Sequence, residues 1–403
     1  MLTASAKLAE IFARSLFALS CIYLLPQKSS GQFAVITTLI AFFVFFSGFE
    51  RYASLQRELV KKKAGVTDLL ISSAFRFFCF NYLIFVPVLS ILLIYWATLT
   101  VYLTFLCIII AISEHIANEF YRITLVSSQH TNIVIMSATK NFTLLLIIFF
   151  IKIKSLDLGL ILILEAWAGL SLLSLLMSVI FNSKNIRHFY KLLPIKPTIL
   201  NQYKLSFTHF KIGILGMLTL QVDRLIISGL LSLEETSLYF QHMMISILAY
   251  QVLGIISFNR VMPEVYKNIH ISNYTKANYL IKKEKVIYIL FSLSLLISAI
   301  ILKTSTSSLN FEPVKNINLI FLIILIMSYL IRGMADFNVM TLNGLHKEKK
   351  VYSALKFTVV ISIFIMIIMT LLLGIKGLVT AFFIGSCIYF IITAKLSKKY
   401  SKK

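Results

Sequence analysis

The stretch FTVVISIFIMIIMTLLLG (357–374) decides the fold class, because it is mostly apolar and contains no charged residue. Lipid offers no hydrogen bonds to a backbone, so a run of this kind enters a bilayer as a helix. About 20 apolar residues span a hydrocarbon core about 30 Å thick. A second run, LILILEAWAGLSLLSLLMSVIF (160–181), has the same character, and hydrophobic residues make up 59% of the chain against 14% charged. The sequence therefore predicts an all-α polytopic membrane protein without a soluble globular domain.

Hydropathy divides the chain into about twelve predicted transmembrane helices. The connections between them are short, and the longest three, at 51–68, 182–204 and 260–284, are basic. The predicted spans are 8–25, 32–50, 69–95, 98–120, 131–151, 158–181, 205–231, 237–259, 285–303, 316–341, 351–373 and 376–394.

The distribution of lysine and arginine predicts the orientation of these spans. With the N-terminus in the cytoplasm, 26 of the 39 Lys and Arg residues fall in cytoplasmic segments and 6 on the opposite side. Cytoplasmic loops of membrane proteins carry such an excess. We therefore expect an inner (plasma) membrane protein with both termini in the cytoplasm. The net charge of +23 is spread over short loops facing an anionic leaflet, which argues against nucleic acid as a partner.

Cysteine usage and loop composition argue against several other classes of protein. The four cysteines all lie in apolar spans, which argues against a disulfide framework, and no metal-ligand spacing accompanies them. The sequence has no phosphate-binding loop, so ATP hydrolysis is not expected. We expect no metal, no cofactor and no catalytic residue.

Two sets of matching segments indicate an internal duplication. LLPQKSSGQF (24–33) matches LLSLEETSLY (230–239) at an offset of 206, and Gly48 matches Gly254 at the same offset. His130 and the segment after it match His346 and its following segment at an offset of 216. Two parallel six-helix halves are predicted, and transporters commonly bind substrate between such halves.

The chain resembles the polysaccharide-transporter branch of the multidrug/oligosaccharidyl-lipid/polysaccharide (MOP) exporter superfamily, which includes Wzx-type O-antigen and capsule flippases. Three segments carry the resemblance, and the second departs from the family pattern at Ser237, where Gly is usual. The segments are LLPQKSSGQFAVITTLIAFFVFFSGFERYASLQREL (24–59), QVDRLIISGLLSLEETSLY (221–239) and the final pair of spans around Gly374 and Gly377.

The resemblance implies a MATE-like fold with two six-helix lobes around a central cleft and transport by alternating access. The implied lobes are 1–181 and 205–403, joined by a basic cytoplasmic linker at 182–204. The implied cargo is an undecaprenyl-diphosphate-linked oligosaccharide for O-antigen or capsule assembly. Membrane lipids, a polymerase and a chain-length regulator are the expected partners.

Basic residues inside the spans are the candidates for binding the diphosphate. Charge within a bilayer is costly and marks functional positions, and the planar fork of Arg suits phosphate. Arg224 is the leading candidate, because it lies in the outer half of its span while the others lie nearer the cytoplasmic ends. The alternative for long basic side chains near helix ends is snorkelling to the headgroups. The candidate cleft residues are Arg224, Arg14, Arg332, Arg76, Lys211 and Lys140.

Acidic residues inside the spans are candidates for ion coupling. Glu114, Asn118 and Arg122 follow one another at i+4 spacing, so they form a polar strip that either packs against other helices or relays ions. Intrahelical pairs, Glu10 with Arg14 and Arg332 with Asp336, are a rival explanation for two of the cations. The coupling candidates are Asp223, Glu114, Asp336 and Glu165.

Two other functions compete with a flippase. An ion-coupled multidrug exporter of the same fold would favour deep carboxylates and an apolar cleft. A membrane-embedded glycan polymerase or glycosyltransferase would need carboxylates in a sizeable outer loop, and the first outer turn, PQKSSG (26–31), has none.

Overall fold

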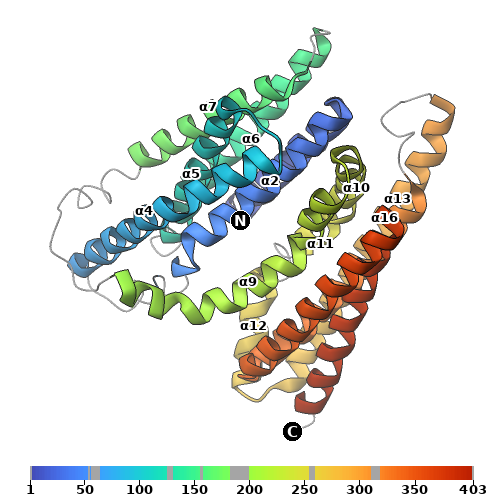
Figure 1. Cartoon of the computed structure of the whole chain (residues 1–403). Coiled ribbons are helices and arrows are strands. Elements are labelled where there is room, and N and C mark those ends of the chain that lie inside the picture. Colours follow the sequence, from blue (N-terminus) through green and yellow to red (C-terminus); the bar gives the residue numbers. More distant parts are fainter. Residues whose placement is uncertain are drawn as a thin grey trace. The chain divides into compact units, whose positions relative to one another are not determined.

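The computed structural model of the chain describes residues 2–52, 55, 64–124, 130–154, 158–181, 199–253, 259–309 and 318–401. Throughout these ranges the regular elements are helices, and strands are absent. The prediction of an all-α polytopic fold is confirmed. In chain order the helices are α1 (Leu2–Leu24), α2 (Gln27–Gly48), α4 (Ala64–Tyr95), α5 (Val101–Thr124), α6 (His130–Ile153), α7 (Leu160–Phe181), α9 (Ile199–Leu230), α10 (Leu233–Ser246), α11 (Leu248–Leu253), α12 (Asn259–His270), α13 (Tyr274–Leu309), α15 (Leu319–Gly344) and α16 (Glu348–Ser401) (Figure 1).

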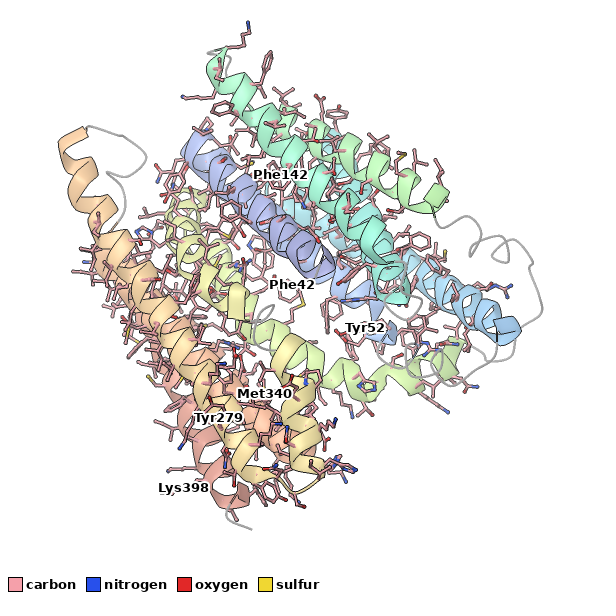
Figure 2. The ribbon with its side chains drawn as sticks, turned by 180° about the vertical axis from the view of Figure 1, so that it is seen from behind. Phe42, Tyr52, Phe142, Tyr279, Met340 and Lys398 are labelled. Atoms are coloured by element: carbon pink, nitrogen blue, oxygen red, sulfur yellow. The ribbon has the colours of Figure 1, made fainter. Side chains whose placement is uncertain are left out.

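Seven of the described helices are long and apolar enough to cross a membrane, judged by length and composition. These spans are Gln27–Gly48, Leu70–Tyr95, Val101–Arg122, Leu160–Ile180, Tyr274–Ile301, Leu319–Gly344 and Glu348–Tyr400. The last contains both of the final predicted spans, 351–373 and 376–394, so these seven helices include eight of the predicted spans. Figure 2 draws the side chains as sticks and labels Phe42 on α2 and Phe142 on α6.

Helix α16 is a hairpin of two helices joined at Gly374. This glycine has φ 59° and ψ −139°, a left-handed conformation that residues with a Cβ rarely adopt. A Cβ on Gly377 would lie 1.8 Å from the carbonyl oxygen of Met369, and a Cβ on Gly385 would lie 2.6 Å from Oγ of Ser362. Both approaches join residues nearly symmetric about Gly374, so the two halves run antiparallel in close contact.

The chain divides into two compact units, Met1–Met217 (unit 1) and Leu218–Lys403 (unit 2). The core of unit 1 includes edge-on aromatic packing of Phe17 of α1 on Phe33 of α2 and on Trp167 of α7, with ring centroids 6.0 and 5.8 Å apart. In unit 2, Val261, Val265 and Ile269 of α12 pack with residues of α13 and α15 in a buried apolar cluster. Apolar residues at i, i+4 and i+8 form one stripe of a helix, which explains why α12 presents a single face to this core.

Helix α12 replaces part of a predicted connection. The segment 260–284 was predicted as a basic connection, with the ninth span starting at residue 285, and the structure has a helix at Asn259–His270 and starts α13 at Tyr274. Hydropathy did not predict α12, because the polar residues of an amphipathic helix lower the mean hydropathy of the segment. The predicted eighth span, 237–259, is also interrupted, since α10 ends at Ser246 and α11 runs from Leu248 to Leu253.

Helix α9 contributes residues to both units. Within unit 1, its N-terminal part stacks Phe210 on Phe49, with ring centroids 3.9 Å apart, and Gln202 accepts a hydrogen bond from the fully buried Arg51. Residues 182–198 of the predicted linker lie outside the described residues, and 199–204 form the start of α9. The two-lobe division at these boundaries stays a prediction.

The helix ends around the first repeat agree with the predicted offset. α1 ends at Leu24 and α9 at Leu230, while α2 begins at Gln27 and α10 at Leu233, so both turns are shifted by 206 residues. The second turn has a capping box, because the Ser232 side chain accepts from the backbone of Glu235 and the Glu235 side chain accepts from the backbone of Ser232. The matching helix ends support a repeated helix–turn–helix. Gly254, part of the same offset, lies outside the described residues.

Candidate functional site

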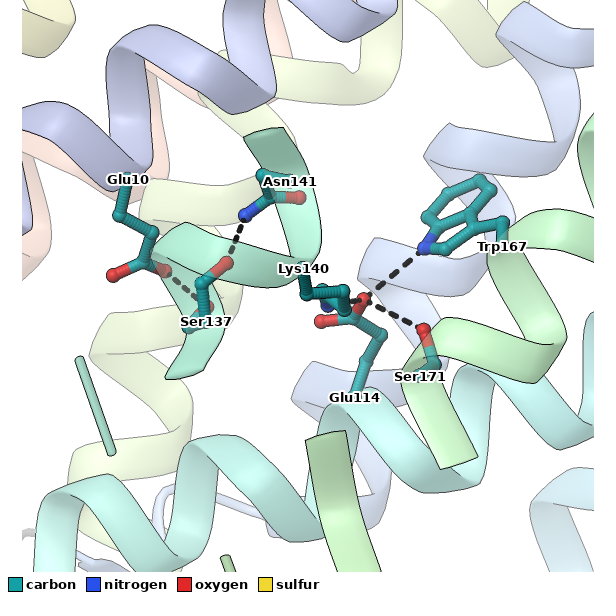
Figure 3. A network of polar contacts seen from close by, with 7 residues as sticks. All are labelled: Glu10, Glu114, Ser137, Lys140, Asn141, Trp167 and Ser171. Carbon is teal, nitrogen blue, oxygen red and sulfur yellow. Dashed lines mark hydrogen bonds and ion pairs between the residues drawn. The ribbon is translucent and has the colours of Figure 1, made fainter. Parts of the chain in front are cut away.

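A charged cluster lies inside unit 1 where α5, α6 and α7 meet. The Lys140 ammonium pairs with Glu114, and the same carboxylate oxygen accepts from Nε1 of Trp167 at 3.2 Å and Oγ of Ser171 at 3.4 Å (Figure 3). Lys140 is buried, with 8% of its surface exposed. The structure therefore turns Lys140 inward to a carboxylate on another helix rather than outward to headgroups.

Helix α1 brings a second carboxylate and a second cation to this cluster. Glu10 accepts a hydrogen bond from Oγ of Ser137 at 2.8 Å, and Ser137 also accepts from Asn141 one turn later on α6 (Figure 3). Arg14 lies within electrostatic range of Glu114, yet its side chain is exposed. The carboxylates of Glu10 and Glu114 balance the charges of Arg14 and Lys140. Of these four side chains, Arg14 is the exposed one.

The rest of the polar strip on α5 packs within unit 1. His115 is fully buried, and its Nδ1 lies 2.5 Å from the Tyr82 hydroxyl of α4. Arg122 donates to Glu119 at 2.6 Å and lies over the Tyr52 ring, 3.9 Å from its centroid. Burial raises the pKa of Tyr52 to about 12. The strip was predicted either to pack against other helices or to relay ions. These contacts support packing.

Unit 2 contains a second charged cluster, built around Arg332. The buried guanidinium donates to the backbone carbonyl of Thr219 on α9 at 2.6 Å and lies over the Tyr389 ring at 5.8 Å. Asp336, one turn along α15, accepts from the hydroxyls of Tyr250 and Tyr389. The helices α9, α11, α15 and α16 are therefore tied together through one arginine and one carboxylate.

A small cavity adjoins Arg332 within unit 2. Its wall includes Thr219, Ser362 and Ser386 among apolar side chains of α9 and α16. Nε of Arg332 and Oγ of Ser362 are buried and lack a hydrogen-bond partner within the described ranges. The space is therefore polar on one side and apolar on the other.

Asp223 and Arg224, adjacent on α9, face different surroundings. Asp223 is fully buried and accepts from the Tyr239 hydroxyl. Arg224 is half-buried, lies over the Phe240 ring at 5.3 Å and approaches Sδ of Met243 at 3.4 Å. In the described part of the chain its Nε has no hydrogen-bond partner. Arg224 is thus a cation within an aromatic and thioether surrounding.

The remaining predicted site residues are Lys211, Arg76 and Glu165. Lys211 is exposed, with its ammonium 4.2 Å from the centroid of the Phe207 ring, and Arg76 is half-buried on α4. Glu165 is exposed on α7 and accepts from the Tyr102 hydroxyl at 2.6 Å. The structure therefore brings together Arg14, Lys140 and Glu114 in unit 1, and Arg224, Asp223, Arg332 and Asp336 in unit 2.

Several polar residues that the sequence analysis did not single out complete these clusters. Tyr239, Tyr250 and Tyr389 supply the hydroxyls that the two aspartates accept. In unit 1, Asn81 donates to the Ser47 carbonyl at 2.8 Å and accepts from a tyrosine of α9. Tyrosines within otherwise apolar runs were the signal available in the sequence, because a buried hydroxyl needs a partner. Among the described residues, no group of three or more His, Cys, Asp or Glu could hold a metal ion.

The chain has the fold of membrane transporters of the MOP superfamily. It is similar over 98% of its length to 87% of the structure of the lipid II flippase MurJ in an inward closed conformation, with a TM-score of 0.70 and 17% identity. It is similar over 100% of its length to 99% of an inward-facing multidrug resistance MATE family transporter of the MOP superfamily, with a TM-score of 0.69 and 12% identity. The Vibrio cholerae MATE transporter VcmN gives a TM-score of 0.61 at 12% identity, over 99% of this chain and 97% of that one.

No family model and no curated protein sequence matches the chain. At these low identities the similarities establish the fold alone, and with it the MATE-like/MOP part of the predicted fold class. They do not distinguish a lipid flippase from a multidrug exporter.

Proposed function

We propose that the chain is a flippase that moves an undecaprenyl-diphosphate-linked oligosaccharide outward across the inner membrane for O-antigen or capsule assembly. The observation that carries the proposal is Arg14. It lies near the middle of α1, and its side chain is exposed. Bare lipid is a costly surrounding for a guanidinium, so this face of α1 borders water.

A diphosphate headgroup is the cargo that such a cation suits. Arg14 is attracted to Glu114, but Glu114 already pairs with Lys140, so the guanidinium keeps its donors available for a phosphate. Arg224 is the corresponding cation in unit 2. The adjacent Asp223 attracts it, and its guanidinium borders the uncharged Phe240 and Met243. Arg332, Arg76 and Lys211 are the further candidates for binding, whereas Lys140 acts through Glu114.

The transport cycle we propose is alternating access between an N-lobe at 1–181 and a C-lobe at 205–403. The linker and both termini face the cytoplasm in this proposal, as the Lys and Arg distribution favours. The fold shared with a lipid II flippase supports the choice of a lipid-linked cargo. A polymerase and a chain-length regulator are the proposed partners at the outer face, and the chain itself performs no catalysis.

The second candidate function is an ion-coupled multidrug exporter. The fold shared with MATE transporters favours it, as do the buried carboxylates. Asp223, Glu114, Asp336 and Glu165 are the residues through which an ion gradient would act in either function.

Substitution of the two arginines tests the proposal. Arg14→Ala and Arg224→Ala, each made alone, should abolish surface glycan while the protein still inserts, and lipid-linked repeat units should accumulate facing the cytosol. Lys376→Ala is the control, since Lys376 is exposed beside the Gly374 turn and belongs to neither cluster. Normal glycan in both arginine variants refutes the assignment. Deletion of the gene with intact glycan and a new drug sensitivity would instead establish the exporter.

A further inference from the structure

One end of unit 2 carries a dense group of exposed lysines. They come from α12, the start of α13 and both ends of α16, and the exposed acidic residues among them are Glu264 and Glu348. The exposed lysines are Lys267, Lys276, Lys282, Lys283, Lys349, Lys350, Lys395, Lys398 and Lys399. The surface formed by these lysines is called the basic corner below.

Direct contacts join the parts of the basic corner. A Cβ on Gly344, at the end of α15, would lie 2.6 Å from Cδ1 of Ile269, so the turn into α16 lies against the end of α12. Lys347 and Lys399 both lie near the Tyr400 ring, at 5.4 and 5.9 Å from its centroid. The end of α16 therefore returns to the turn where α16 begins. Figure 2 draws Tyr279 and Lys398 toward the same end of the unit.

Helix α12 presents its polar side outward because its apolar side packs against α13 and α15. Val261, Val265 and Ile269 are buried against α13 and α15. An amphipathic helix on a membrane usually buries its apolar face in lipid, whereas here that face packs against protein. The exposed charged residues of α12 are Glu264 and Lys267, and Ile271, which follows the helix, is 61% exposed.

The exposed face of α13 carries lysines near the start of the helix and apolar side chains farther along. Val286, Leu290 and Ile297 are 54%, 61% and 56% exposed, as expected for a stripe that faces lipid. Toward the start of the helix the same face continues with Lys283, Tyr279 and Lys276, at i, i−4 and i−7. At 1.5 Å per residue these three span about 10 Å. That depth is similar to the headgroup layer, where tyrosine and lysine are favoured.

We propose that the basic corner is a binding site for anionic phospholipid headgroups. The phosphate of a lipid whose tails lie along Val286 and Leu290 reaches the ammonium groups of Lys276, Lys282 and Lys283 without leaving the leaflet. Tyr279, 65% exposed, supplies the amphipathic ring at the boundary. The continuous passage from apolar stripe to lysines fits a lipid rather than a soluble acidic protein, which would meet the lysines but not the stripe.

The neighbouring Lys285 does not belong to the basic corner. Its ammonium donates to Oδ1 of Asn338 at 3.2 Å, so it points into unit 2. Lys282 and Lys283, only three and two residues earlier, point outward. The outward lysines are therefore those on the same side as the lipid-facing stripe.

Lipid counting by native mass spectrometry tests the site on the full-length protein. Phosphatidylglycerol and phosphatidylcholine are added at equal concentration in a neutral detergent. A lysine near an anionic surface strengthens binding about fivefold, so the triple variant Lys276→Gln, Lys282→Gln and Lys283→Gln should lower the preference for phosphatidylglycerol by about tenfold or more. The same three positions changed to Arg should keep the preference.

A matched control and a competitor complete the test. Lys152→Gln, Lys154→Gln and Lys376→Gln remove three exposed lysines elsewhere and should leave the lipid preference unchanged. An unchanged preference in the basic-corner variant, or an equal loss in the control, overturns the proposal. Displacement of phosphatidylglycerol by inorganic pyrophosphate, but not by sulfate at matched ionic strength, also overturns it, because the site would then select a diphosphate.

Discussion

The pair of Lys140 and Glu114 allows a double-mutant cycle inside unit 1. Glu114→Gln keeps an oxygen for Trp167 and Ser171 to donate to, and removes only the charge that neutralises Lys140. Leaving one partner of a buried ion pair alone lowers the free energy of unfolding by about 3–5 kcal/mol. For 403 residues, an unfolding entropy of about 2.1 cal/mol/K per residue converts this loss to a fall in Tm of about 4–6 °C.

A second variant tests whether the loss of stability comes from the unpaired charge of Lys140 rather than from altered packing. Adding Lys140→Met to Glu114→Gln removes the orphaned cation, so the double variant should regain stability to within about 1 kcal/mol of the unchanged protein. A coupling free energy of about 2–4 kcal/mol between the two substitutions is expected.

Buried native thiols provide the assay. Cys21 and Cys107 are fully buried, so a thiol-reactive fluorophore reports their exposure on heating in a Cys79→Ser background. Glu165→Gln is the control, because that carboxylate is exposed and its Tm effect should be small. An unchanged Tm for Glu114→Gln, or a double variant as unstable as the single one, would refute the reasoning. Restored stability without restored export would instead assign an ion-coupling role to Glu114.

The same thermal assay measures three further substitutions. Gly377→Ala places a methyl group against the Met369 carbonyl, which cannot move without opening the hairpin, and should lower stability by about 3 kcal/mol. Ser232→Ala removes the capping box of α10 and should lower it by about 1 kcal/mol, whereas Ser232→Asp should not. Arg332→Met removes the hydrogen bond from Arg332 to the Thr219 carbonyl and should lower stability by about 1–3 kcal/mol, with Arg332→Lys intermediate.

Hydropathy and turn residues predicted most of the fold. The predicted spans lie on helices in the described part of the chain, with the eighth divided between α10 and α11, because lipid allows few alternatives for an apolar run. The Gly374 turn followed from a glycine between two such runs. The amphipathic α12 escaped prediction, because Lys267 and Glu264 lower the mean hydropathy of a helix whose buried side is apolar.

The candidate charges were found from the sequence, but their partners were not. Lys140 and Glu114 are 26 residues apart and lie on different helices, and the depth of Lys140 alone was equally compatible with snorkelling. Arg51 follows a span and was counted as a loop charge, yet it is fully buried and bonded to Gln202, 151 residues later. Contacts of this kind depend on which helices become neighbours, and a single sequence does not contain that information.

The hairpin in α16 limits how its two halves can move. The backbone carbonyl of Met369 faces Gly377 and Oγ of Ser362 faces Gly385, where a Cβ would lie 1.8 and 2.6 Å away. Sliding one half along the other would bring a side chain into the place of a glycine, and close-packed interiors leave no room for it. The two halves of α16 are therefore expected to move as one rigid body whenever unit 2 changes conformation.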